Sequence, residues 1–378
     1  MRPWIEKQRN ILDFALSSLG RRKGKNIALA SVYIVLVLLL ASVMFFTHAL
    51  RREAALVLRD SPSLIVQRMA AGRHDLIPAS YIDAIQTIRG VSAVHGRLWG
   101  YYFDPVIGAN YTLVAPEDFA HPPGSIVIGQ GVARIRAAAV GDLMPLRRYD
   151  GQLSYFTVVE ELSSDSELVS SDLMLLSQQD FRSLFHLPDG MFTDIVLEVR
   201  NSKELTTVAS KITGLLPDTR PITRSEVLRT YESIFDWRSG IVIVLLSAVA
   251  LAFVIFAWDK ASGLSAEEKK EIGVLKAIGW ETADVLWLKF WEGTIISLTS
   301  FLAGLLLAYV HVFLTPVMLF EPVLKGWSVI YPEFRLVPSV DPYQVVTLFF
   351  LTVVPYTVAT IIPSWRAATI DPDAVMRS

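Results

Sequence analysis

The chain of 378 residues is too apolar and too poor in charge for an ordinary soluble enzyme. Hydrophobic residues make up 52% of it, charged residues 19%, and its mean hydropathy is +0.42, whereas soluble domains carry about 25% charged residues. A formal net charge of −2 gives no basic excess and argues against nucleic-acid binding. The absence of cysteine excludes disulfides, Cys-ligated zinc and a thiol nucleophile. These figures favour a membrane protein with an additional folded domain.

Four stretches without Asp, Glu, Lys or Arg predict transmembrane helices, at residues 27–46, 241–257, 293–314 and 343–362. A helix of about 20 residues covers the roughly 30 Å of a bilayer core. A cleaved signal peptide explains the first stretch poorly, because the stretch is longer than a usual signal-peptide core and no clear cleavage site follows it. We therefore expect an uncleaved first span.

The distribution of Lys and Arg predicts the orientation. Residues 1–26 and 259–292 are rich in basic side chains, whereas the loop 315–342 holds only Lys325 and Arg335. Because basic residues in short flanks favour the cytoplasmic side, we expect both termini and the 259–292 loop in the cytoplasm, and the 47–239 segment outside.

The 47–239 segment is about half of the chain and shows mixed α and β patterns. Short β-branched runs predict strands at residues 63–67, 125–129 and 193–199. Helical spacing predicts helices at residues 78–89 and 203–216, and the charged residues 50–60 predict a helical extension of the first span. The segment is therefore expected to form one α+β domain or two small ones.

No motif in this domain indicates an active site. The histidines are scattered, and the chain has no His-Glu-x-x-His, Gly-x-Ser-x-Gly, Walker A or dinucleotide-binding motif. The acidic residues from Glu160 to Asp172 are best explained as a solvated loop face. We expect no catalytic residue, metal site or cofactor. The alternative that the sequence leaves is an active site assembled from residues that are far apart in the chain.

The predicted spans carry no charged side chain, which argues against proton relay or ion conduction. His311 is expected to face water or the interface near the outer end of the third span. Pro355 is expected to kink the fourth, and Gly293 and Gly304 allow close helix contacts. Four spans make a small bundle, so we expect a working unit of at least two chains.

Residues 266–280 combine strong helix formers with an apolar stripe at Ile272, Leu275 and Ile278. The pattern predicts a short amphipathic helix at the inner membrane surface. Its role stays open on the residues alone, because such a helix could rest on lipid headgroups or present its polar face to a cytoplasmic partner.

Two motifs carry a family resemblance. Glu267 to Gly279 is Glu-x-x-x-Glu-Ile-Gly-x-Leu-Lys-Ala-x-Gly, and the tail holds Pro-Ser-Trp-Arg-Ala-Ala from Pro363, followed by Asp371 and Pro372. With the order of one span, a large external domain and three spans, the chain resembles the FtsX-like (MacB/LolC/LolE-type) ABC transporter permeases. The resemblance is strongest over residues 259–378.

The resemblance implies an α-helical membrane protein with four transmembrane helices and a large mixed α+β extracytoplasmic domain between the first and second. Nine parts follow from it: a cytoplasmic amphipathic segment at 1–26, a span at 27–46, a periplasmic MacB-like domain at 47–239, a span at 240–258, a cytoplasmic loop with a coupling helix at 259–292, a span at 293–314, an external loop at 315–342, a span at 343–362 and a cytoplasmic tail at 363–378.

The same resemblance implies a non-catalytic permease subunit in the bacterial cytoplasmic (inner) membrane. It would pair with a second copy or a paralogue and with a cytoplasmic ABC ATPase dimer, which would bind the ATP and Mg²⁺ because this chain lacks Walker motifs. ATP-driven motion would pass to the external domain for export or extraction of lipoprotein-like, peptide or other hydrophobic cargo. A periplasmic adaptor or substrate protein is a further partner that it allows, besides membrane lipid.

The resemblance also implies which residues contact the ATPase: Glu267, Lys269, Lys270, Glu271, Ile272, Gly273, Leu275, Lys276 and Gly279. Two alternatives to the transporter remain at this stage. One is an FtsX-type signalling complex that regulates an extracytoplasmic partner, and the other is a membrane-anchored sensor or enzyme that works without an ATPase.

Overall fold

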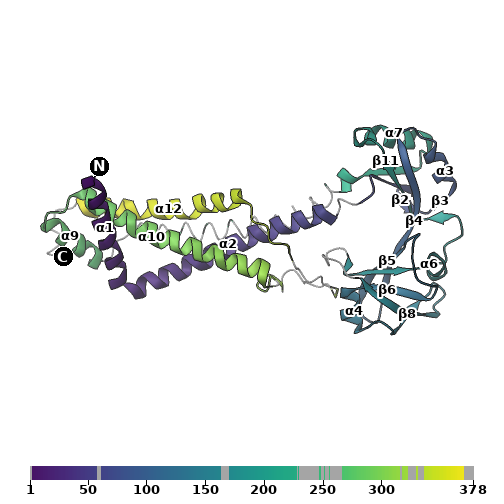
Figure 1. Ribbon diagram of the computed structural model, residues 1–378, viewed down its shortest axis with the longest axis horizontal. Coiled ribbons are helices and arrows are strands. Elements are labelled where there is room, and N and C mark those ends of the chain that lie inside the picture. The colour runs from purple at the N-terminus through teal and green to yellow at the C-terminus, as the bar shows by residue number, and fades with distance from the viewer. Residues whose placement is uncertain are drawn as a thin grey trace. The chain divides into compact units, whose positions relative to one another are not determined.

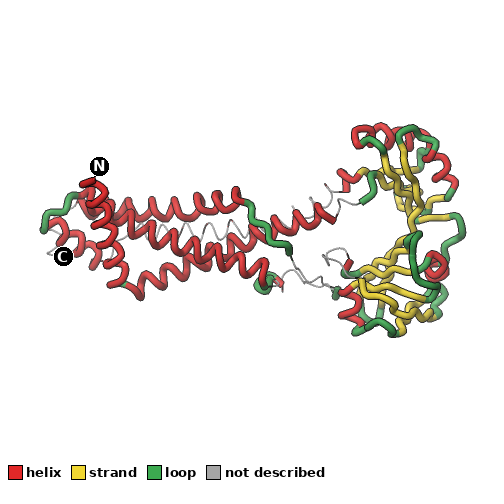
Figure 2. Tube along the Cα trace, in the orientation of Figure 1, coloured by secondary structure: helices red, strands yellow, loops and turns green. Residues whose placement is uncertain are grey.

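A computed structural model of the chain describes residues 2–57, 61–162, 170–227, 266–315, 317–321, 329–330 and 336–369, with the single residues 229, 247, 251 and 255. The chain divides into two compact units, which are described separately below. The helical unit comprises residues 1–49, 237–317 and 337–378, and the sheet unit comprises residues 50–236 and 318–336. Figures 1 and 2 show the helices of the first unit and the strands of the second.

The described helices of the helical unit are α1 (Arg2–Arg21), α2 (Lys23–Val57), of which residues 50–57 belong to the sheet unit, α9 (Ala266–Ala277), α10 (Thr282–Tyr309) with a π-helical turn at Val310–Leu314, and α12 (Pro342–Thr369). Three of the described segments are long and apolar enough to cross a membrane: Lys23–Glu53, Thr282–Leu314 and Pro342–Arg366. They contain the predicted spans at 27–46, 293–314 and 343–362. The predicted span at 240–258 lies outside the described residues apart from three single positions, so the count of four spans stays a prediction.

The helices extend beyond the charge-free stretches that predicted them. The helical extension expected at 50–60 is present as far as Val57, where the described part of α2 ends. Helix α10 begins at Thr282, with a reciprocal capping box between Glu281 and Asp284. It then carries Lys289 and Glu292, which are paired at 2.6 Å and largely buried. Lys289 and Glu292 compensate each other's charge inside the protein, so the helix can begin before them. The start of the charge-free stretch therefore does not mark the start of the helix.

His311 corrects one expectation. Its side chain is buried, and its Nδ1 lies 3.0 Å from the Oγ of Ser42 on α2. It was expected to face water or the membrane interface. The hydroxyl partner on a neighbouring helix explains how an imidazole is accommodated inside the bundle.

Small residues bring the membrane-length helices into close contact. A Cβ atom at Gly304 of α10 would lie 2.7 Å from the Cβ of Val37 on α2. One at Gly293 would lie 2.6 Å from the Oγ1 of Thr360 on α12. The close contacts expected at both glycines are therefore confirmed. Helix α12 continues through Pro355 as one element, and the kink expected there stays a prediction.

The sheet unit contains twelve described strands: β1 (Leu64–Ala70), β2 (Arg73–Asp75), β3 (Ile77–Pro78), β4 (Val91–Asp104), β5 (Ala109–Ala115), β6 (Ser125–Gly129), β7 (Leu143–Arg147), β8 (Leu153–Leu162), β9 (Leu173–Leu176), β10 (Met191–Phe192), β11 (Asp194–Val199) and β12 (Thr219–Thr223). Its described helices are α3 (Ser80–Gln86), α4 (Gln130–Arg136), α6 (Gln178–Phe185), the short 3₁₀ turn Ser202–Glu204 and α7 (Leu205–Leu215). The strands predicted at 63–67, 125–129 and 193–199 correspond to β1, β6 and β11. The predicted helices correspond to α3 and α7, so the mixed α and β interpretation is confirmed.

One long strand organises the main sheet, whose order is β12-β1-β11-β4-β5-β9-β6-β8-β7. The first half of β4 pairs with β11, and the second half pairs with β5 from Leu98 to Asp104. The two halves of the sheet have separate cores. One core lies around Leu64, Ile195 and Val208, and the other around Leu98, Ile126 and Phe181.

A buried carboxylate on β11 and its donors on β4 fix this pairing. Asp194 is 1% exposed and accepts hydrogen bonds from Arg97 Nε at 2.8 Å, from Arg97 NH2 at 2.7 Å and from the indole of Trp99 at 2.9 Å. In the register of the two strands, Asp194 lies opposite Arg97. A buried carboxylate with three donors is well satisfied, and a shift in register would leave it unpaired.

Candidate coupling helix and the elbow that holds it

Helix α9 ends in a Schellman motif at a glycine. The backbone N–H of Trp280 donates to the carbonyl of Leu275 at 3.0 Å, and that of Gly279 donates to Lys276 at 3.1 Å. Gly279 has φ +101°, a left-handed conformation that glycine adopts without steric cost. The glycine that closes the predicted motif therefore ends the helix and turns the chain into α10.

One side of α9 packs inside the helical unit. Ile272 forms a small core with Val285 of α10 and Ala368 of α12. Leu275 packs with Ile11 and Ala15 of α1 and with Leu288 of α10. Both side chains are at most 5% exposed. The helix is therefore anchored to three other helices of this chain.

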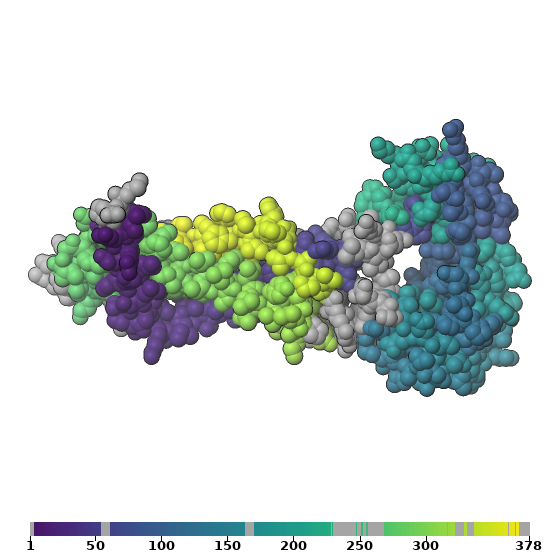
Figure 3. Space-filling model, in the orientation of Figure 1, coloured from purple at the N-terminus to yellow at the C-terminus, as the bar shows by residue number. Residues whose placement is uncertain are grey.

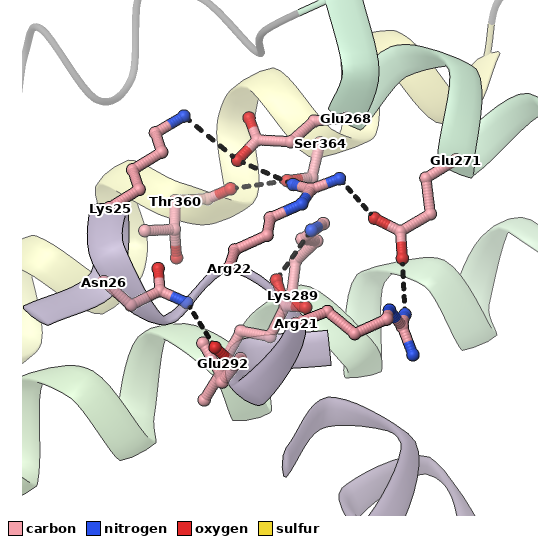
Figure 4. Close-up of polar contacts among 11 residues, drawn as sticks. Arg21, Arg22, Lys25, Asn26, Glu268, Glu271, Lys289, Glu292, Thr360 and Ser364 are labelled. Carbon is pink, nitrogen blue, oxygen red and sulfur yellow. Dashed lines mark hydrogen bonds and ion pairs between the residues drawn. The ribbon is translucent and has the colours of Figure 1, made fainter. Parts of the chain in front are cut away.

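Two acidic residues of α9 pair with the turn between α1 and α2 and with the start of α2, which together we call the elbow (residues 21–25). Glu268 pairs with Arg22 at 3.1 Å and with Lys25 at 3.5 Å, and Glu271 pairs with Arg22 at 2.6 Å and with Arg21 at 2.9 Å. Figure 4 shows Arg22 pointing between the two carboxylates. The polar half of the predicted amphipathic helix thus also has partners within this chain.

The end of α12 gives α9 a further attachment. The ammonium of Lys276 donates to the backbone carbonyl of Ala368 at 2.5 Å. A cation near the last carbonyls of a helix is favourable because the helix dipole is negative there. Lys276 therefore ties the end of α9 to the end of α12.

The opposite side of α9 is exposed. Lys269 and Lys270 are exposed, Val274 is 47% exposed and Ile278 is 69% exposed. Lys270, Val274 and Ile278 follow one another at four-residue spacing, so they lie along one stripe of the helix and its cap. This exposed stripe, which combines one cation with two apolar side chains, is the surface that α9 offers to a partner.

A polar cavity of ≈ 40 Å³ lies beneath the elbow, lined among others by Arg22, Glu268, Lys289, Glu292 and Tyr356. It is large enough for ordered water, which needs about 10–15 Å³ of such space. Lys289 and Glu292, on α10, pair with each other across one turn at 2.6 Å. Arg22 and Glu268 therefore meet in a polar pocket whose lining lysine, Lys289, is paired with Glu292.

The N-terminal helix covers the start of α10. Gln8 accepts a hydrogen bond from the indole of Trp291 at 3.0 Å, and the rings of Phe14 and Trp280 lie 5.3 Å apart. Lys7 pairs with Asp284 at 2.7 Å. Figure 3 shows α1 lying against α10. Because α10 follows α9 directly, these contacts strengthen the hold of α1 on the coupling region.

The structure places the predicted coupling residues in different environments. Ile272, Gly273 and Leu275 are buried, while Glu271 and Lys276 are held by intramolecular polar contacts. Lys269, Lys270 and Gly279 are exposed, and the side chain of Glu267 lies outside the described part of the structure. Their role against an ATPase stays a prediction.

Sequence reasoning missed the partners that hold α9. It used the basic residues Arg21, Arg22 and Lys25 to predict membrane topology and gave them no partner, although two glutamates one turn apart on α9 offered matching charges. Among the described residues, no group of three or more His, Asp or Glu could hold a metal ion.

The comparisons with known proteins concern both units. The family model described as "FtsX-like permease C-terminal" matches residues 238–372, which include α9, α10 and α12. Among solved structures, the chain is similar to the extracellular domain of the ABC-type transporter YknZ from Gram-positive bacteria, at 9% identity and a TM-score of 0.30, over 42% of this chain and 99% of that one. It is also similar to the periplasmic region of MacB from Actinobacillus actinomycetemcomitans, at 9% identity and a TM-score of 0.32, over 47% of this chain and 98% of that one. Scores this low carry no conclusion about function. No curated protein matches the chain.

Proposed function

We propose that this chain, whose residues 238–372 match the family model described as "FtsX-like permease C-terminal", is the permease subunit of an ABC transporter powered by a separate cytoplasmic ATPase. The observation that carries the proposal is the division of α9 into two sides. One side is anchored to the elbow, α10 and α12, and the other presents Lys270, Val274 and Ile278. A helix exposed on one side and fixed on the other is suited to receive force from a docked partner.

The exposed stripe has the chemistry of a docking surface. Two apolar side chains, with exposures of 47% and 69%, contribute hydrophobic area that is unfavourable in water. Lys269 and Lys270 beside them carry positive charge that steers an acidic partner surface. We propose that this stripe, rather than the buried Ile272 and Leu275, enters a groove on each ATPase subunit.

Movement of α9 would reach the membrane-length helices through its anchors. Helix α2 begins at the elbow and is continuous for 35 residues, a length of about 52 Å at 1.5 Å per residue. That exceeds the roughly 30 Å of a bilayer core. We propose that α2 carries the ATP-driven movement from the cytoplasmic side toward the sheet unit, which would act on lipoprotein-like, peptide or other hydrophobic cargo.

The proposed arrangement places two permease chains, identical or paralogous, against an ATPase dimer in the cytoplasmic membrane. Support for a force-transmitting permease comes from the membrane-length helices, whose segments 293–314 and 343–362 hold no Asp, Glu, Lys or Arg. Conduction of ions or protons normally needs such residues.

Co-purification with the ABC ATPase expressed in the same cell tests the proposal. A tagged wild-type chain is expected to bring down the ATPase. Ile278→Asp and Val274→Asp are expected to abolish this without lowering the melting temperature of the permease, because both positions are exposed. Val106→Asp is the matched control, since Val106 is an 86% exposed valine of the sheet unit. Wild-type chain that brings down no ATPase, or Asp variants that bind it like the control, would refute the proposal.

A further inference from the structure

One guanidinium joins the elbow to both acidic side chains of α9. Arg22 NH1 contacts Glu268 at 3.1 Å and Arg22 NH2 contacts Glu271 at 2.6 Å. Glu268 and Glu271 are three residues apart and therefore share one side of the helix. A planar guanidinium presents its donors in a rigid fork, so a single arginine can fix two neighbouring carboxylates at once.

Arg22 differs from its basic neighbours in its burial. The side chain of Arg22 is 22% exposed and that of Glu268 is 8% exposed, whereas Arg21 and Lys25 are 54% and 53% exposed. Exposed pairs contribute little because water and salt screen them. Removal of a partner from a buried pair has a larger effect, because the remaining charge is left without compensation.

Among the described residues, Arg22 is the cation that pairs with both Glu268 and Glu271. Lys25 reaches Glu268 only at 3.5 Å from an exposed position. Lys289 lines the same cavity but pairs with Glu292 at 2.6 Å. Arg22 therefore adds a polar contact on Glu268 and Glu271 to the apolar packing of α9.

We propose that Arg22 is a positioning residue of α9, and that α1 with the elbow forms part of the coupling site. By holding Glu268 and Glu271, Arg22 would set the direction in which the stripe of Lys270, Val274 and Ile278 faces. Helix α1 would then help to determine which way this stripe faces, in addition to lying at the membrane as an amphipathic segment. The consequence for ATPase coupling rests on the proposed function, whereas the orientation of α9 does not.

A distance measurement on the permease alone tests the orientation. The natural chain has no cysteine, so Ser17→Cys on α1 and Ile278→Cys at the end of α9, both exposed, take spin labels at two defined positions. In the full-length chain in detergent, pulsed electron paramagnetic resonance is expected to give one narrow distance distribution. Arg22→Gln is expected to broaden or shift it, and Arg22→Lys, which cannot fork between two carboxylates, is expected to lie between the two.

Lys23→Gln is the matched control, because it removes one positive charge at the elbow from an exposed residue that forms no ion pair with any described residue. It is expected to leave the distribution unchanged. If Arg22→Gln does not fold, Arg22→Gln combined with Glu268→Gln removes the uncompensated charge, and the same broadening is expected. The orientation claim would be overturned if Arg22→Gln, or the double variant where that is the one measured, gave the wild-type distance distribution. It would also be overturned if Lys23→Gln broadened the distribution as much.

A second readout tests the coupling claim separately. With the ATPase present, Arg22→Gln in the chain without labels is expected to reduce permease-dependent stimulation of ATP hydrolysis by about tenfold, within the usual range of coupling between sites. A broadened distance with full stimulation would overturn the role of Arg22 in coupling. A wild-type chain that binds no ATPase would refute the proposed function, while the distance measurement would still decide the orientation claim.

Discussion

Gly304 allows the sharpest test of how the membrane-length helices pack. A methyl group at this position of α10 would lie 2.7 Å from Val37 Cβ, 2.8 Å from Val37 Cγ1 and 2.9 Å from the carbonyl oxygen of Ile34, all on α2. Contacts between a Cβ and other heavy atoms are essentially never this short. Gly304→Ala therefore forces α2 and α10 apart.

The expected net effect is destabilising. Alanine gains up to about 1 kcal/mol over glycine in helix propensity, whereas overpacking of a well-packed site costs about 1–3 kcal/mol. We expect Gly304→Ala to lose stability, and the larger Gly304→Leu to lose more. Val37→Ala removes the Cγ1 contact but leaves the Cβ and the Ile34 carbonyl, so it is expected to rescue Gly304→Ala only in part.

Thermal unfolding in detergent measures these effects. Gly24→Ala is the matched control, because Gly24 is an exposed glycine of α2 whose added Cβ would meet nothing within 4 Å. That variant is expected to be as stable as the wild type or more so. If Gly304→Ala melts at the same temperature as Gly24→Ala, the close approach of α2 and α10 is refuted.

Two further predictions concern the sheet unit. Arg97→Ala leaves the carboxylate of Asp194, which is 1% exposed, without its charged partner and is expected to destabilise the sheet unit by about 3–5 kcal/mol, measured by hydrogen exchange of β4 and β11. A loss below about 1 kcal/mol, typical of an exposed pair, would contradict this. The hydrogen bond from Arg68 at 2.9 Å lowers the pKa of Asp218 below its ordinary value. Because the folded pKa is the lower one, this pair stabilises the protein above the unfolded pKa near 4, and the contribution is lost as the pH falls through the folded value. The stability difference between wild type and Arg68→Gln is therefore expected at pH 7 and should shrink on acidification, and a difference that grows at low pH would contradict the assignment.

The helices could largely be predicted from the sequence because their signals are local. Charge-free stretches indicated α2, α10 and α12, and helix formers with an apolar stripe indicated α9. The boundaries were less accurate, because charged residues that find partners inside the protein do not end a helix. Lys289 and Glu292 show this in α10.

The exposed side of α9 could be predicted only in part. The resemblance assigned Ile272 and Leu275 to the ATPase contact, whereas both are buried inside this chain. Ile278, which continues the same apolar stripe, is exposed at the C-cap, where the Gly279 turn changes the direction of the chain. The partners of α9 could not be predicted, since Arg22 and Glu271 are 249 residues apart. The strand order could not be predicted for the same reason, because β4 pairs with β11, which lies far from it in the sequence.

The most direct test of the central claim is site-specific photocrosslinking from α9 to the ATPase. A photoreactive residue in place of Ile278, which is 69% exposed, is compared with one in place of Ile272, which is 2% exposed. If the exposed stripe is the docking surface, a crosslink to the ATPase is expected from position 278 and none from position 272. A crosslink from position 272, or none from position 278 in a complex that contains the ATPase, would contradict it.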